Sequence, residues 1–83
     1  MIVAGVVIET MPGEAARVAA SLGAVDGLEL QGSDGDRRLA GVWTGADGAA
    51  LQRAAERLLA SDPGILGVFP TFVGDDAEPR PSR

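Results

Sequence analysis

The side chains available for chemistry are few in type. The 83-residue chain contains no Cys, His, Lys, Tyr or Asn, and all seven of its basic residues are Arg. Without Cys and His it lacks the usual zinc ligands, and without His, Lys and Tyr it lacks most general bases that act near neutral pH. Carboxylates, hydroxyl groups and arginines remain. We therefore expect a protein that is not an enzyme and that has no metal centre and no cofactor.

The remaining charged residues suit ion pairing better than catalysis. Glu9 follows an apolar run and Glu29 lies in an alternating segment, and one interpretation that stays open for both is a solvated charge at the edge of the sheet surface. The Asp34-Gly35-Asp36 stretch is too short for a calcium-binding loop, so we expect a turn there. A net charge of −5 argues against nucleic acid as a partner and suits a basic partner.

Nothing in the sequence predicts a membrane span or an export signal. No segment approaches the roughly 20 apolar residues that a spanning helix needs, and no basic region precedes the first apolar run. The Arg37-Arg38 pair lies in mid-chain, where we expect the start of a strand. We therefore expect a cytoplasmic protein with one domain at residues 1–74. Residues 75–83 are acidic and then rich in Pro and Arg, which predicts a disordered tail.

The apolar run at residues 2–8 predicts the strand on which the rest of the fold depends. It is short and rich in β-branched residues, as strands are. Alternate side chains of a strand point to opposite faces of the sheet. Because both faces of this strand carry apolar side chains, we expect it to lie in the middle of a sheet. One face would carry Ala4, Val6 and Ile8, and the other Val3, Gly5, Val7 and Glu9.

Helical and strand patterns alternate along the rest of the chain. A helix is predicted to start with Pro12 as its first helical residue and to end at Leu22. A second helix is predicted to start after Asp47, its N-cap, and to stop at residues 62–64. Pro70 predicts that the last strand lies at an edge of the sheet. The other strands are predicted at residues 28–31, 37–44 and 65–73, with a hairpin loop at 32–36.

This order of elements predicts an α+β fold, the ferredoxin-like βαββαβ sandwich. Its four-stranded antiparallel sheet would have the first and third strands in the centre. Right-handed crossovers would place two helices on one face. Trp43 is predicted to lie in the core between the helices and the sheet, with a position at the rim of a binding surface as the alternative.

The other face of the sheet has no segment to cover it, and it is the predicted binding surface. Contiguous exposed apolar area usually marks a partner site. Two further interpretations stay open: a homodimer packed sheet to sheet, and an apolar surface without a role. Phe69 could alternatively turn inward into the core. The apolar centre of this predicted binding surface, which we call the expected floor, consists of Gly5, Val7, Ala40, Val42, Gly67 and Phe69. Glu9 and Glu29 lie at its edges, and Thr71 lies beside it.

Several functions found on ferredoxin-like folds do not suit these residues. A metal chaperone needs paired Cys, and an acylphosphatase-like enzyme needs Asn, and the chain has neither. An RNA-binding module needs aromatic and basic residues on its central strands, where this chain has Val, Gly and Ala. A regulatory domain that binds a small ligand or dimerises remains as an alternative.

The chain resembles the NapD family, the cytoplasmic chaperones of the catalytic subunit of periplasmic nitrate reductase. The resemblance extends from about Ala4 to about Asp76. Near the end of the last strand the chain departs from the family pattern, because Phe72-Val73 stands where an aromatic residue is often followed by His. The matching segments are residues 4–9, Leu22, residues 26–30, residues 39–42, Asp47 with Leu51, and residues 64–68.

The resemblance implies a function in protein export. It implies that the protein binds the twin-arginine signal peptide of the reductase and delays its export until the molybdenum cofactor has been inserted. The expected floor would take the apolar side of the peptide, and Glu9 and Glu29 would pair with its arginines. The protein would be a monomer or a weak homodimer through the uncovered face.

Overall fold

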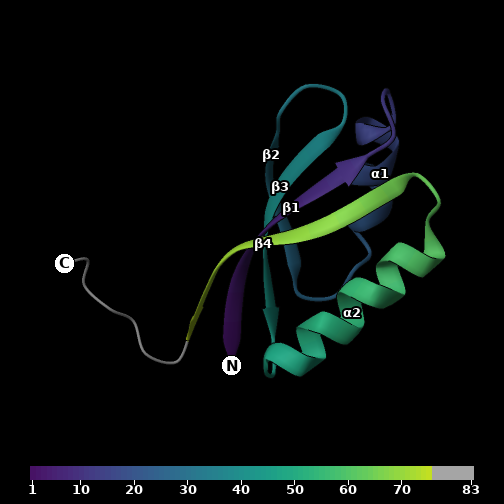
Figure 1. Ribbon diagram of the computed structural model, residues 1–83. Coiled ribbons are helices and arrows are strands. Elements are labelled where there is room, and N and C mark those ends of the chain that lie inside the picture. The colour runs from purple at the N-terminus through teal and green to yellow at the C-terminus, as the bar shows by residue number, and fades with distance from the viewer. Residues whose placement is uncertain (76–83) are drawn as a thin grey trace.

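The computed structural model describes residues 1–75, and it has the predicted ferredoxin-like α+β fold (Figure 1). Both helices lie on the same side of one four-stranded antiparallel sheet. The elements are β1 (Ile2–Thr10), α1 (Ala15–Leu22), β2 (Leu28–Ser33), β3 (Arg38–Gly45), α2 (Gly48–Ser61) and β4 (Ile65–Asp75).

The strand order is β2-β3-β1-β4, so β1 and β3 occupy the centre as predicted. The β1–β3 register places Ala4 opposite Trp43 and Ile8 opposite Leu39. Because opposed residues share a face, this register brings the buried positions of both central strands together on the helix side. The strand with Pro70, β4, lies at an edge, as its proline predicted.

The hydrophobic core lies between the helices and the sheet. Ile8 and Val18 are completely buried, and Trp43 is 3% exposed, which confirms its predicted place in the core. The indole nitrogen of Trp43 donates a hydrogen bond to the carbonyl of Asp26 at 3.2 Å, so its polar atom is satisfied. The other core residues are Ala4, Val6, Ala15, Leu22, Leu39 and Ile65.

The two helices differ in how they begin. Asp47 caps α2 as predicted, since its carboxylate accepts a hydrogen bond from the amide of Ala50 at 2.8 Å. The prediction for α1 was wrong at its start, because the helix begins at Ala15 and Pro12 lies in the preceding turn. Gly13 has a φ of +82°, which a helix cannot include, so the turn displaces the helix start by three residues.

The last strand is longer and less regular than predicted. It ends at Asp75 instead of residue 73, and its pairing with β1 shifts between Gly5 and Val6. Thr71 is the extra residue of the resulting β-bulge, because Gly5 pairs with Phe72 while Val6 pairs with Pro70. Apart from Asp75, the predicted tail lies outside the residues that the structure describes.

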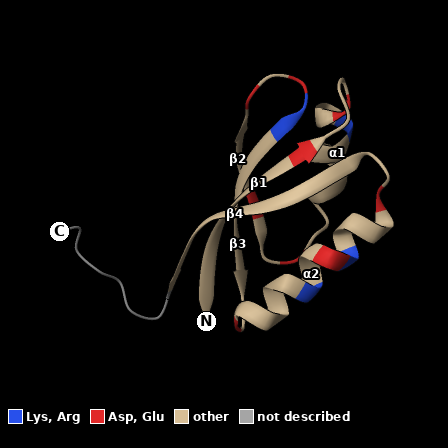
Figure 2. Ribbon diagram, viewed as in Figure 1, with Lys and Arg blue, Asp and Glu red and all other residues tan. Residues whose placement is uncertain are grey.

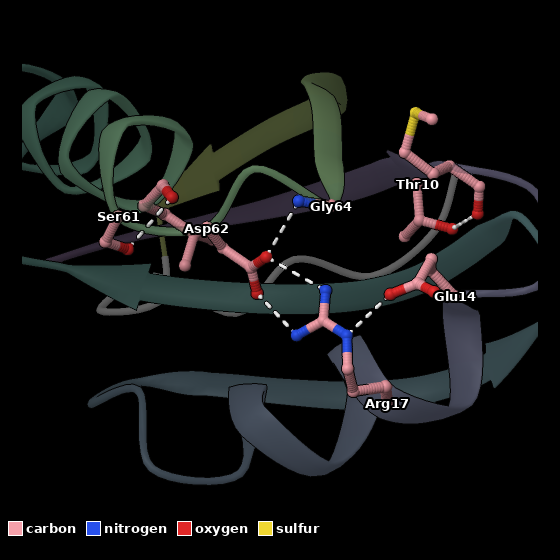
Figure 3. Close-up of polar contacts among 8 residues, drawn as sticks. Thr10, Glu14, Arg17, Ser61, Asp62 and Gly64 are labelled. Atoms are coloured by element: carbon pink, nitrogen blue, oxygen red, sulfur yellow. Dashed lines mark hydrogen bonds and ion pairs between the residues drawn. The ribbon is translucent and has the colours of Figure 1, made fainter.

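An ion-pair cluster connects the start of α1 to the end of α2 (Figure 3). The guanidinium of Arg17 lies 2.6 Å from Glu14 and 3.0 Å from Asp62, and the Oδ1 atom of Asp62 also accepts a hydrogen bond from the amide of Gly64 at 2.9 Å. A Cβ atom on Gly64 would collide with the Arg17 guanidinium, so glycine leaves room for it. The hydrogen bonds from Arg17 and Gly64 lower the pKa of Asp62.

Candidate binding face

The sheet face opposite the helices is not covered by any element within residues 1–75 (Figure 1). We call it the open face. All eight residues predicted for the site lie on this face according to strand alternation and register. It consists of Val3, Gly5, Val7 and Glu9 of β1, Glu29 of β2, Arg38, Ala40, Val42 and Thr44 of β3, and Gly67, Phe69, Thr71 and Phe72 of β4.

Two phenyl rings lie over the two glycines of the open face. A Cβ atom on Gly5 would come within 2.6 Å of the Phe72 ring, and one on Gly67 within 2.6 Å of the Phe69 ring. Both glycines are therefore buried, although they belong to the face without helices. Both glycines belong to the expected floor, and the rings of Phe72 and Phe69 cover them. The rings form the exposed surface instead.

The exposed aromatic pair is the most prominent apolar feature of the open face. Phe69 is 51% exposed and Phe72 is 57% exposed, so Phe69 does not turn into the core. Across the strand pairing, Phe69 lies opposite Val7, which is half-buried. Ala40 lies opposite Val7 on the other side. The rings are thus continuous with small apolar side chains on the central strands.

The sequence analysis did not include Phe72 among the site residues. Strict alternation along β4 places Phe69 and Thr71 on one face and Phe72 on the other. The bulge at Thr71 breaks this alternation, and both Thr71 and Phe72 then lie over Gly5. Pro70 was the available signal, since proline inside a strand indicates either an edge or a bulge, and here both apply.

Apart from Glu29, the charged residues of the open face gather where β1 ends and β3 begins (Figure 2). Arg38 pairs with Glu9 across the two central strands, with 3.6 Å between Nε and Oε2. Its Nη1 atom lies 3.8 Å from Oδ2 of Asp34 in the β2–β3 hairpin. A hollow of about 460 Å³ adjoins this group and is lined by Val7, Ala40 and residues 31–34.

Glu29 lies apart from this charged group. It pairs with Val42, which pairs with Gly5, four residues before Glu9. At about 3.3 Å per residue and about 4.8 Å per strand, the Cα atoms of Glu29 and Glu9 are roughly 16 Å apart. The structure therefore does not bring the two predicted carboxylates together, and Asp34 is the carboxylate that joins Glu9 at Arg38.

A second apolar cavity lies on the helix side, between α2 and the β1–β4 half of the sheet. Its volume is about 340 Å³, and its walls include Val6, Leu51, Val68 and Val73. Gln52 contributes the polar side chain at its rim. The helix beside this cavity, α2, has no buried residue, whereas α1 has three.

Neither a metal cluster nor a membrane span is found in the part of the chain that the structure describes. Residues 1–75 contain no group of three or more carboxylates placed to hold a metal ion. Among the same residues, no helix has the length and apolar content needed to cross a bilayer. Comparison of the chain with models of protein families, with curated proteins and with solved structures found no match.

Proposed function

We propose that this protein is a chaperone that binds the twin-arginine signal peptide of the catalytic subunit of a periplasmic nitrate reductase. Binding in the cytoplasm would delay export until the molybdenum cofactor has been inserted. One observation carries the proposal: an uncovered sheet face presents two exposed phenyl rings beside carboxylates, on a protein with a net charge of −5. The resemblance of the sequence to the NapD family supports the same function.

The chemistry of the open face complements that of such a peptide. A twin-arginine signal peptide combines two guanidinium groups with an apolar stretch. Phe69, Phe72 and Val7 offer an apolar surface, and a phenyl ring also attracts a guanidinium placed over its face. Glu9 and Glu29 offer carboxylates for bidentate pairing. Binding of this kind requires neither a catalytic residue nor a cofactor.

The test is a titration of the isotope-labelled protein with a synthetic peptide that has an arginine pair followed by an apolar stretch. We expect the amide signals of Val7, Val42, Phe69 and Phe72 to shift, because these residues lie on the open face. The amides of α1 and the exposed side of α2 serve as internal controls and should stay in place. Shifts confined to the helices, or no binding, would overturn the proposal.

The cavity beside α2 favours one alternative, a regulatory domain that binds a small apolar ligand. The cavity has a volume of about 340 Å³ and apolar walls, which suit a short acyl chain or a single aromatic ring. This alternative predicts that small apolar metabolites shift the signals of Leu51 and Val68, with the open face unaffected. Light scattering adds a second criterion, because a regulatory domain of this type should form a stable dimer.

A further inference from the structure

Arg38 occupies a place on the open face where a guanidinium of the ligand would bind. It lies on the central strand β3, and its guanidinium faces the carboxylates of Glu9 on β1 and Asp34 in the hairpin. Arg38 and Asp34 line the hollow of about 460 Å³, which is open to solvent and also borders the apolar residues Val7 and Ala40. An arginine of the protein itself therefore holds Glu9, one of the two carboxylates that the proposed function assigns to the arginines of the peptide, together with Asp34.

The two contacts of Arg38 are long. A hydrogen bond between N–H and O spans about 2.7–3.2 Å, whereas Arg38 lies 3.6 Å from Glu9 and 3.8 Å from Asp34. Its side chain is 54% exposed, and an exposed pair without hydrogen bonds shifts an equilibrium by a factor of only about 1–5. An incoming guanidinium that makes shorter, bidentate contacts can therefore replace it at little cost.

We propose that Arg38 is an internal competitor for the arginine of the ligand. In the free protein it neutralises Glu9 and Asp34, and in the complex a guanidinium of the peptide takes its place while Arg38 turns into solvent. This inference rests on the proposed function, since it requires a ligand that carries arginine. It makes Arg38 a residue that lowers the affinity of the open face.

The test compares the affinity of one synthetic twin-arginine peptide for three proteins by isothermal titration calorimetry. Arg38→Gln should bind the peptide about 3–5-fold more tightly than the wild type, because the competitor is gone. Arg37→Gln is the matched control. It removes the same charge from the neighbouring exposed residue, which has no carboxylate within 4.0 Å in residues 1–75. It should change the affinity less than about 2-fold.

If Arg38→Gln and Arg37→Gln increased the affinity for the peptide equally, the inference would be overturned, because the change in net charge alone would then account for both increases. A second arm repeats Arg38→Gln in a Glu9→Gln background, where the gain in affinity should be smaller, since only Asp34 remains to be released. A gain of undiminished size there would also overturn the inference.

Displacement itself can be observed in the NMR spectrum of the wild type. The side-chain Nε–Hε signal of Arg38 should move toward the position of a free arginine when the peptide binds, while that of Arg17, which is hydrogen-bonded to Glu14 and Asp62, should stay. Peptide binding without movement of the Arg38 signal would refute the competitor and leave the proposed function in place. Absence of peptide binding to the wild type would refute the proposed function, and the inference with it.

Discussion

The two faces of this sheet contain similar residues in different states. Both faces carry apolar side chains on the central strands, and both have an arginine between two carboxylates. On the helix side Ile8 is fully buried, and Arg17 makes hydrogen bonds to Glu14 and Asp62. On the open face the phenyl rings are half exposed, and Arg38 makes only long contacts.

This difference shows that packing decides the role of a residue type. Where a helix covers the sheet, apolar area contributes to folding. On that side Arg17 also makes hydrogen bonds that connect α1 to the end of α2. Where no element of residues 1–75 covers the sheet, the same residue types remain available to a partner. The following predictions test this distinction, because each variant has a counterpart on the other face or at a neutral position.

The largest expected effect is on stability, at the covered face. Ile8→Ala should lower the free energy of unfolding by about 2–5 kcal/mol, because it leaves a cavity in the core. Val7→Ala, one residue away on the open face, should cost only about 1 kcal/mol, since Val7 is half-buried. Urea unfolding, followed by the fluorescence of Trp43, the single tryptophan, measures the free energy of unfolding of both variants.

If Ile8→Ala does not fold, Ile8→Val takes its place, with an expected loss of about 0.5–1.5 kcal/mol in the free energy of unfolding. Equal losses at positions 7 and 8 would contradict the distinction between the faces.

The next effect is on binding, at the open face. Phe72→Ala should weaken binding of the twin-arginine peptide about 10-fold, or about 1.4 kcal/mol, because it removes an exposed aromatic anchor. Leu59→Ala is a suitable control, since Leu59 is an exposed apolar residue of α2, on the other side of the sheet. Calorimetric titration compares the two. An unchanged affinity in Phe72→Ala would remove the aromatic pair from the proposed site.

A smaller effect concerns the pH dependence of stability. The folded protein lowers the pKa of Asp62 below its ordinary value, through the hydrogen bonds from Arg17 and Gly64. The ionised carboxylate of Asp62 therefore stabilises the folded state. This stabilisation is fully present above the unfolded-state pKa of about 3.9 and is lost as the pH falls through the lower folded-state pKa. Asp62→Asn should reduce the loss of stability between about pH 5 and pH 3, as measured by urea unfolding at each pH. Equal slopes in wild type and Asp62→Asn would exclude the role of this cluster.

The smallest effect is expected at the isolated carboxylate of the open face. Glu29→Gln should weaken peptide binding less than about 3-fold and slightly reduce its dependence on salt, because an exposed ion pair contributes little. Glu9→Gln should weaken it more, since Glu9 and Asp34 flank the same guanidinium position. Titrations at two salt concentrations compare the variants. A larger effect at Glu29 than at Glu9 would move the arginine site toward β2.

Much of the fold followed from local patterns in the sequence. The order of strand and helix patterns along the chain predicted the topology and the central strands, and Asp47 and Pro70 predicted the N-cap of α2 and the edge strand. The start of α1 was missed because the left-handed backbone of Gly13 is a property of the turn and not of a periodic pattern. The contact between Arg17 and Asp62 was missed because the two residues are 45 positions apart.

The sequence by itself determined the order of the elements, the identity of the core face and the absence of the residue types that most enzymes use, because periodicity and composition are local properties. Only the tertiary structure decided which side chains form the surface of the open face. A bulge in β4 brings Phe72 over Gly5, and strand pairing brings Arg38 between Glu9 and Asp34. Both arrangements depend on register between segments distant in the chain, and side-chain alternation within one strand cannot reveal that register.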